Sequence, residues 1–372
     1  MVHSPPQRPA HGGNLAWAAA IALCHPQDIL DFSASINPLG PPASAIAALQ
    51  SGMATLRDYP DPSYSQLRAA LGQAHQLSPD WILPGNGAAE VLTWAGYELT
   101  SCKAVVLPTP AFGDYGRSLH TFGVLVLPQS LDLEAIALGQ SPSLVDLSTL
   151  PYAPEDCGLL INNPHNPTGH LWTAEALLPY LQAFKQVVID EAFMDFLPED
   201  EQQSLVPWIA DYPNLVILRS LTKFYSLPGL RLGYAITHPD RVQRWQSWRD
   251  PWTVNALADL AGQAVVGDRL FQQQTRQWLP PARQSLMAGL AALPGLRPYP
   301  GAANYLLVQT EASSTALQQR LLTRHRILVR DCISFPDLGD RFFRIAVRRP
   351  EENQRLLEGL ADCTSVDSIQ CS

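Results

Sequence analysis

Short apolar runs alternate with helical patterns from about residue 81 to residue 236. This alternation constrains the fold more than any other feature, because it is typical of parallel strands that helices bury on both faces. We therefore expect an α/β fold with a mostly parallel central sheet. The expected strands cover residues 105–107, 124–127, 159–162, 187–190, 215–218 and 233–236.

The rest of the chain predicts two further units. Helical patterns over 253–292 precede strand patterns at 304–308, 327–330 and 342–347, which together indicate a smaller α+β domain. The beginning of the chain is rich in Pro and Gly, and Asn14 there suits the N-cap of a short amphipathic helix. We expect an N-terminal arm over 1–40 that packs on the small domain and the active site, a large domain over 41–250 and a small domain over 251–372.

Composition excludes several classes of function. The 372 residues include 46% apolar residues, enough to fill a sizeable core. The net charge of −9 and the absence of a basic cluster argue against nucleic acid as a partner. No run approaches the roughly 20 apolar residues of a membrane span. The six cysteines lack metal-binding spacing, so we expect reduced thiols in a cytoplasmic protein and no metal.

Polar motifs follow several of the expected strands at their carboxyl ends, where open α/β sheets bind ligands. The most informative motif is the segment 220–234, SLTKFYSLPGLRLGY. The amine of Lys223 can form a Schiff base with an aldehyde, while Ser220, Thr222 and Arg231 can surround a phosphate with donors and positive charge. These are the groups needed to hold pyridoxal 5'-phosphate.

Two other motifs suit the same cofactor. Gly85, Asn86 and Gly87 open a helix, whose first amides and positive dipole end can receive a phosphate. Asp190 emerges at the tip of a buried strand, where a carboxylate needs a positive partner such as a protonated pyridine nitrogen. The alternative for Asp190 is a cap at the end of its strand.

Two single residues are weaker candidates. Phe112, in the segment 108–115, can stack on the cofactor ring, although packing in the core would explain it nearly as well. Asn166 lies in a turn whose prolines fix the backbone, so its amide can point into a cleft. An Asn-Pro turn without a binding role is the alternative there.

Taken together, the motifs resemble those of the fold-type-I pyridoxal-phosphate enzymes of the aspartate aminotransferase superfamily, over nearly the whole chain. Within that group the chain is similar to two families, the histidinol-phosphate aminotransferases and the L-threonine-O-3-phosphate decarboxylases of cobalamin biosynthesis. The decarboxylase family is favoured by Thr222 and Pro228 in the lysine motif and by four other segments. These segments are HGGN at 11–14, LDFSASINPLG at 30–40, and ILVRDC at 327–332 with FFRIAVR at 342–348.

The resemblance implies a role for each site residue. Lys223 would bond the cofactor aldehyde, Asp190 would pair with the ring nitrogen, and Asn166 would contact the phenolic oxygen or the substrate carboxylate. The implied ligands of the cofactor phosphate are Gly85, Asn86, Gly87, Ser220, Thr222, Arg231 and, from a second subunit of a homodimer with shared sites, Tyr59. Arg344 would bind the substrate carboxylate, and the substrate's own phosphate would contact Arg330, His11, Gly12 and Asn37.

Two arginines far from the lysine suit a substrate with two anionic groups, because guanidinium forks match carboxylate and phosphate oxygens. The implied reaction is decarboxylation of L-threonine O-3-phosphate to (R)-1-amino-2-propanol O-2-phosphate. An aminotransferase acting on histidinol phosphate is the main alternative, and both reactions share these motifs. Phe193 replaces a tyrosine that many aminotransferases carry, which weakens that alternative. A regulatory module with this fold is expected to carry an additional DNA-binding domain, and no such pattern precedes residue 11 or follows residue 361.

Overall fold

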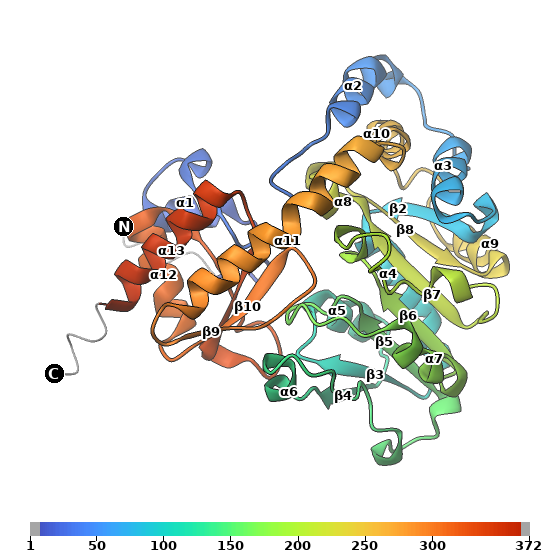
Figure 1. The fold of residues 1–372 in the computed structure, drawn as a ribbon. Coiled ribbons are helices and arrows are strands. Elements are labelled where there is room, and N and C mark those ends of the chain that lie inside the picture. The colour runs from blue at the N-terminus through green and yellow to red at the C-terminus, as the bar shows by residue number, and fades with distance from the viewer. Residues whose placement is uncertain (1–7, 366–372) are drawn as a thin grey trace, which may run out of the picture.

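The computed structural model describes residues 8–365 and contains a large sheet that is mostly parallel (Figure 1). Its seven strands lie in the order β2-β8-β7-β6-β5-β3-β4, and β8 alone runs antiparallel to its neighbours. The predicted α/β class is therefore confirmed. The strands are β2 (Ile82–Asn86), β3 (Ala104–Thr109), β4 (Val126–Ser130), β5 (Cys157–Asn162), β6 (Gln186–Asp190), β7 (Leu215–Ser220) and β8 (Leu232–Thr237).

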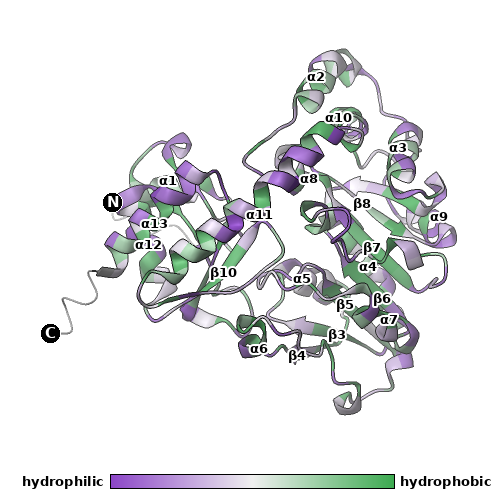
Figure 2. Ribbon diagram, viewed as in Figure 1, coloured by the Kyte–Doolittle hydropathy of each residue, from purple (hydrophilic) through white to green (hydrophobic). Residues whose placement is uncertain are grey.

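Helices cover both faces of this sheet because its buried strands carry apolar side chains on both. Along β6, Val187 and Ile189 face one core cluster and Val188 faces the other, as the alternation of a strand requires. The face of Val188 packs against α4 (Ala88–Glu98), α5 (Gly113–Thr121) and α9 (Pro239–Trp248). The opposite face packs against α3 (Ser65–His75), α6 (Leu133–Ala137), α7 (Ala174–Ala183) and α10 (Ala256–Val266). The ribbon coloured by hydropathy shows the same distribution, with apolar strands inside and mixed helices outside (Figure 2).

A second, antiparallel sheet is formed by the C-terminal part of the chain, in the order β12-β13-β10-β9. Its strands are β9 (Leu296–Pro298), β10 (Tyr305–Thr310), β12 (Arg330–Asp331) and β13 (Phe342–Ala346). The helices of this part are α11 (Arg269–Ala291), α12 (Ser314–His325) and α13 (Pro350–Ser365). The strand expected at 327–330 is divided, because β11 (Ile327–Leu328) pairs with a different partner from β12.

That partner is the beginning of the chain. β1 (Leu30–Asp31) runs parallel to β11, and α1 (Leu15–Ala22) packs its buried Ala18 and Ala19 against Leu322 and Leu328. Asn14 caps α1 as the sequence predicts, since its Oδ1 accepts a hydrogen bond from the amide of Trp17 at 2.9 Å. The chain then continues to the large sheet through α2 (Ala43–Gly52). The domain boundaries expected at residues 40 and 250 stay predictions.

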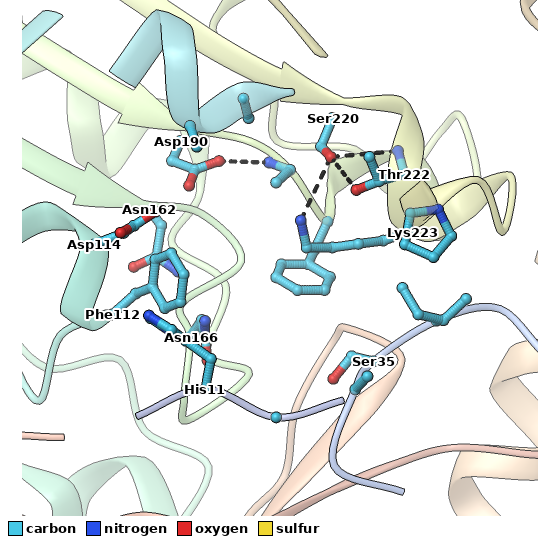
Figure 3. Close-up of a pocket in the computed structure, with 18 of the residues that line it drawn as sticks. His11, Ser35, Phe112, Asp114, Asn162, Asn166, Asp190, Ser220, Thr222 and Lys223 are labelled. Atoms are coloured by element: carbon cyan, nitrogen blue, oxygen red, sulfur yellow. Dashed lines mark hydrogen bonds between the residues drawn. The ribbon is translucent and has the colours of Figure 1, made fainter. Parts of the chain in front are cut away.

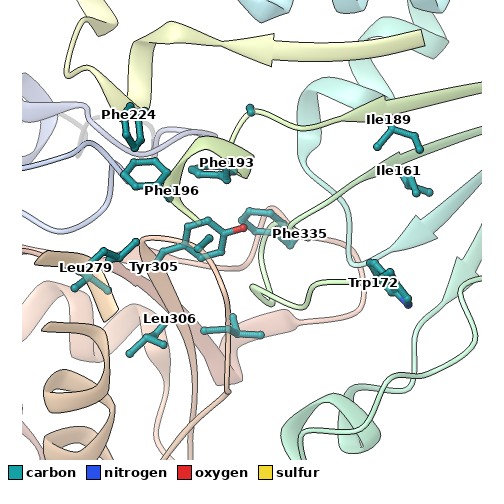
Figure 4. Packing of buried hydrophobic residues seen from close by; sticks show 14 of the residues in the cluster. Ile161, Trp172, Ile189, Phe193, Phe196, Phe224, Leu279, Tyr305, Leu306 and Phe335 are labelled. Atoms are coloured by element: carbon teal, nitrogen blue, oxygen red, sulfur yellow. The ribbon is translucent and has the colours of Figure 1, made fainter. Parts of the chain in front are cut away.

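Aromatic side chains fill the space between the two sheets (Figure 4). Phe224, from α8 (Leu221–Phe224), contacts Phe196 edge to face with ring centroids 5.1 Å apart. Phe193 contacts Tyr305 of the small sheet in the same way, at 4.8 Å. Through these contacts, the helix that carries Lys223 belongs to an aromatic cluster that reaches from the large sheet to the small sheet.

Within residues 8–365 no helix is long and apolar enough to cross a membrane. Cys24, Cys102, Cys157 and Cys332 are free thiols.

Strand β8 approaches the start of α4 so closely that only glycine fits at position 233. A Cβ atom there would lie 2.4 Å from the amide nitrogen of Ala88 and 2.8 Å from the carbonyl oxygen of Arg219. We expect Gly233→Ala to lower the free energy of unfolding by about 2–3 kcal/mol, because backbone atoms must move. Urea denaturation measures this change. Gly267→Ala is the matched control, since it has open space and φ of −87°, and equal midpoints for the two variants would contradict the prediction.

Candidate active site

A cavity of about 430 Å³ opens at the carboxyl ends of β5, β6 and β7, between the large sheet and the small sheet (Figure 3). The N-terminal segment and the small sheet close its other side. Most residues predicted for the site lie in its lining. These are His11, Gly12, Phe112, Asn166, Asp190, Ser220, Thr222, Lys223, Arg231, Arg330 and Arg344.

Lys223 enters the cavity from a four-residue helix that starts where β7 ends. Ser220 caps this helix, and its Oγ lies 2.7 Å from Thr222 Oγ1 and 3.4 Å from Lys223 Nζ. Burial lowers the pKa of Lys223, and the guanidinium groups of Arg231 and Arg344 lower it further, while Asp190 opposes the change. A depressed pKa increases the fraction of neutral amine, which is the nucleophilic form.

Asp190 lies opposite the lysine at the tip of β6. Its Oδ1 accepts a hydrogen bond from the amide of Ala192 at 2.9 Å, and its Oδ2 accepts one from the hydroxyl of Tyr115 at 2.8 Å. Burial raises the pKa of Asp190, although Lys223 and both hydrogen bonds oppose this. The carboxylate therefore caps the local backbone and also faces the cavity, so the two interpretations of this residue are compatible.

Hydroxyls, a guanidinium and a helix start meet at one end of the cavity. Arg231 has φ of +58°, and its Nη2 lies only 2.5 Å from the position that a Cβ atom on Gly87 would occupy. The lining here includes Ala88 and Ala89, the first residues of α4, together with Ser220 and Thr222. This donor set fits a phosphate group.

The glycine turn before α4 lies just behind this lining. Gly85, Asn86 and Gly87 are not among the cavity residues, and the amide of Asn86 donates to Glu90 Oε2 at 2.6 Å. Their assignment as phosphate ligands stays a prediction.

Aromatic residues bound the middle of the cavity. The ring of Phe112 is half-buried and lies 5.8 Å from the ring of His11 and 5.6 Å from that of Tyr115. It lines the cavity while packing against the core, so both sequence interpretations remain open. The ring of Phe193 lies 5.3 Å from Lys223 Nζ and offers no hydrogen bond to a ligand.

Arg330 and Arg344 lie directly opposite each other on neighbouring strands of the small sheet. Residues paired in this way project from the same face of a sheet, here into the cavity. Arg344 donates to Asn166 Oδ1 and to the carbonyl oxygen of Ser33, while its Nε has no partner. Burial lowers the pKa of both arginines. Two buried guanidinium groups on one face create a strong preference for a ligand with negative charge.

The N-terminal segment contacts Arg330. Arg330 Nη2 donates to the carbonyl oxygen of Ala10 at 2.5 Å and also to Ser334 Oγ. His11 and Gly12 follow directly and line the cavity beside it. The arm therefore forms part of the wall where the second anionic group of a substrate would lie.

The structure does not bring Asn37 and Tyr59 into the cavity lining of this chain. The side-chain nitrogen of Asn37 donates to the carbonyl oxygen of Phe224 and to Thr275 Oγ1, both at 2.8 Å. Tyr59 is 80% exposed and packs against Trp252, with ring centroids 4.6 Å apart. The contact predicted for Asn37 is thus not found in this cavity. Tyr59 was predicted to reach the cofactor of a second subunit, and that contact stays a prediction.

Several residues near the site were missed by sequence reasoning. Ser33, Tyr115 and Phe335 line the cavity. Ser33 and Tyr115 lie in the segments 30–40 and 108–115, which the sequence analysis used without giving either residue a role, whereas Phe335 lies in none of the motifs. Behind the cavity wall, Arg219 is 2% exposed and pairs with Glu191 at 2.7 Å and with Asp195 at 2.9 Å. The available signal was the position of these two charged residues, because Arg219 directly precedes the lysine motif and Glu191 directly follows Asp190, each at the end of an apolar strand.

Comparison with known proteins gives consistent matches. The family model for aminotransferase class I and II matches residues 27–360. The threonine-phosphate decarboxylase of Salmonella typhimurium is 40% identical over 357 residues, covering 94% of this chain and 95% of that protein. The histidinol-phosphate aminotransferase of Symbiobacterium thermophilum is 33% identical and covers 90% of each chain. The crystal structure of histidinol-phosphate aminotransferase from Sinorhizobium meliloti in complex with pyridoxal-5'-phosphate shares the fold, with a TM-score of 0.80, 22% identity and 98% of each chain covered.

Proposed function

Because the chain belongs to the aminotransferase class I and II family, we propose that it is a pyridoxal-phosphate-dependent decarboxylase acting on L-threonine O-3-phosphate. The product would be (R)-1-amino-2-propanol O-2-phosphate, for the nucleotide loop of cobalamin. The 40% identity with the Salmonella typhimurium threonine-phosphate decarboxylase, over nearly the full length of both chains, supports this choice.

The observation that carries the proposal is the pair of arginines on the small sheet. Arg330 and Arg344 are cross-strand neighbours and both line the cavity. The two buried guanidinium groups repel each other, and the carboxylate of Asp331, whose Oδ1 lies 3.7 Å from Arg330 Nη1, balances only part of this charge. A substrate with a carboxylate and a phosphate neutralises both, and each group can accept paired hydrogen bonds.

The residues of the cavity fit pyridoxal 5'-phosphate. When bound, this cofactor supplies an aldehyde that condenses with amines and a ring that takes up the electron pair released at the substrate α-carbon. Ser220, Thr222 and Arg231 would hold its phosphate beside the start of α4. Lys223 would bond its aldehyde, and Asp190 would pair with its ring nitrogen.

Substrate orientation then selects the reaction. Arg344, with Asn166, would hold the carboxylate, while Arg330 and His11 would hold the phosphate. By fixing both ends of the substrate, these residues would determine which bond at the α-carbon is oriented to break. Lys223 lines the same cavity, and its amine would be able to deliver a proton to the α-carbon of a substrate bound there.

Transamination of histidinol phosphate is the second candidate. It is supported by the 33% identity with the Symbiobacterium thermophilum aminotransferase. Histidinol phosphate carries a phosphate but no carboxylate, so it would give only one of the two arginines an anionic partner. Phe193 lacks the hydroxyl that many aminotransferases offer at this position, and its ring lies beside Lys223 Nζ. Decarboxylation is therefore the better-supported function.

One incubation separates the two functions. Purified protein is mixed with pyridoxal 5'-phosphate and L-threonine O-3-phosphate, and the products are analysed by mass spectrometry. We expect aminopropanol phosphate without any added keto acid, and no product from Lys223→Ala, which lacks the amine. Turnover that requires 2-oxoglutarate would refute decarboxylation.

Arg330→Ala tests the proposed phosphate contact. We expect KM for L-threonine O-3-phosphate to rise by about tenfold or more, because a charge-assisted contact of roughly 1.5–3 kcal/mol is lost. Steady-state kinetics measure the change. Arg355→Ala, which alters an exposed arginine of α13, is the control and should leave KM unchanged. An unchanged KM in Arg330→Ala would remove this residue from the substrate site.

We infer that two chains form a dimer with shared active sites. Tyr59 and Trp252 form an exposed aromatic pair, and Met53 and Leu56, also exposed, precede Tyr59 by only a few residues. Such neighbouring apolar side chains on a surface indicate a protein contact. Tyr59 would reach the cofactor phosphate of the other chain.

Mixed dimers test this arrangement. Tyr59→Ala and Lys223→Ala proteins are unfolded together and refolded, so that some dimers contain one chain of each kind. In such a dimer, the chain with Lys223 receives Tyr59 from its partner, and one complete site results. We expect the mixture to exceed the summed activity of the two variants. A mixture equal to that sum, or a monomer in light scattering, would exclude shared sites.

A further inference from the structure

Tyr115 is the cavity residue whose contact with Asp190 has no assigned role. It lies in the first turn of α5, three residues after Phe112, and is 1% exposed. Its hydroxyl donates to Asp190 Oδ2 at 2.8 Å, while the amide of Ala192 donates to Oδ1 at 2.9 Å. Each oxygen of the carboxylate thus accepts one hydrogen bond from the protein.

These two donors have a direct chemical consequence for the carboxylate. A hydrogen bond to the charged form of an acid stabilises that form and makes the oxygen a weaker base. Burial acts in the opposite direction and raises the pKa of Asp190. Tyr115 itself stays neutral, because burial and the neighbouring Asp190 raise its pKa well above the ordinary value. It is therefore a permanent donor.

Other charged and titratable groups also face this pair. Lys223 lies on the opposite side of the cavity and favours the ionised carboxylate, whereas Asp114 of α5 opposes it. Tyr305 of the small sheet interacts with Tyr115 through space, but its hydroxyl donates to the carbonyl oxygen of His165 at 2.9 Å. Among the described residues, Tyr115 is thus the side chain that donates a hydrogen bond to Asp190.

We propose that Tyr115 is a positioning residue that keeps a proton on the ring nitrogen of the cofactor by weakening Asp190 as a base. The inference rests on the proposed placement of the ring nitrogen at Asp190. A carboxylate and a pyridine nitrogen compete for the proton between them, and the weaker base loses it. With the hydroxyl of Tyr115 in place, the proton stays on the nitrogen and the ring keeps the positive charge that lets it accept electrons.

The geometry of α5 supports a role in holding the ring. Phe112 and Tyr115 contact each other edge to face, with ring centroids 5.6 Å apart and an interplanar angle of 84°. The start of one helix would thus provide both the face that covers the ring and the donor that adjusts its acid partner. If Tyr115 only filled space in the core, its ring would be sufficient and its hydroxyl would not be needed.

Tyr115→Phe removes the hydroxyl and keeps the ring. The variant is loaded with cofactor labelled with ¹⁵N at the ring nitrogen, and the ¹⁵N chemical shift is recorded without substrate. We expect the signal to move from the pyridinium position toward that of neutral pyridine. In kinetic assays we expect kcat to fall about tenfold while KM changes little, because a hydrogen bond to a charged group is lost.

Two other variants make the result decisive. Tyr234→Phe removes a buried hydroxyl that lies 2.7 Å from His75 Nε2, outside the cavity, and should leave the ¹⁵N shift unchanged. Asp190→Asn should abolish the pyridinium signal. A shift that responds to Asp190→Asn but not to Tyr115→Phe would overturn the role of Tyr115 alone. If neither variant moves the signal, the ring nitrogen is not at Asp190, and the proposed placement of the cofactor fails as well.

Discussion

The buried ion pair between Arg219 and Glu191 holds together the wall on which the active site is built. Both side chains are almost fully buried, and their charged atoms lie 2.7 Å apart. A charge in this environment is tolerated only with a partner, and removal of one member of such a pair typically costs about 3–5 kcal/mol. The pair therefore connects the carboxyl ends of β6 and β7 firmly. Asp190 and Ser220, the direct neighbours of these residues in sequence, face the other side and enter the cavity.

The end of β7 and the start of α8 present side chains on two sides of the backbone. Arg219 and Leu221 point away from the cavity, whereas Ser220, Thr222 and Lys223 line it. Charges used for stability are thus separated by the backbone from charges used for chemistry. This separation matters because Lys223 and Asp190 need perturbed pKa values, which an additional fixed charge inside the cavity would alter.

The second half of the site comes from the small sheet and the beginning of the chain. Arg330 and Arg344 share one face of that sheet, and the carbonyl oxygen of Ala10 accepts a hydrogen bond from Arg330. Asp337 joins this region to the large sheet, since its Oδ2 accepts hydrogen bonds from Thr109 Oγ1 at 2.5 Å and from Ser130 Oγ at 3.2 Å. Substrate recognition therefore depends on the packing of the two sheets, whereas the groups proposed for the cofactor lie mainly on the large sheet.

The amino-acid sequence by itself determined the mostly parallel sheet and the cavity positions of Lys223, Asp190 and Arg231. It could do so because hydrophobic periodicity and turn chemistry are local properties, and the ends of parallel strands meet at one edge. Tertiary structure alone decided that Tyr115 reaches Asp190 and that the side chain of Asn37 donates hydrogen bonds to Phe224 and Thr275. It also decided that 327–330 forms two strands with different partners. Those contacts join residues that are far apart in the chain, such as Leu30 and Ile327. They depend on how helices and sheets pack, and no local pattern in the chain carries a signal for that packing.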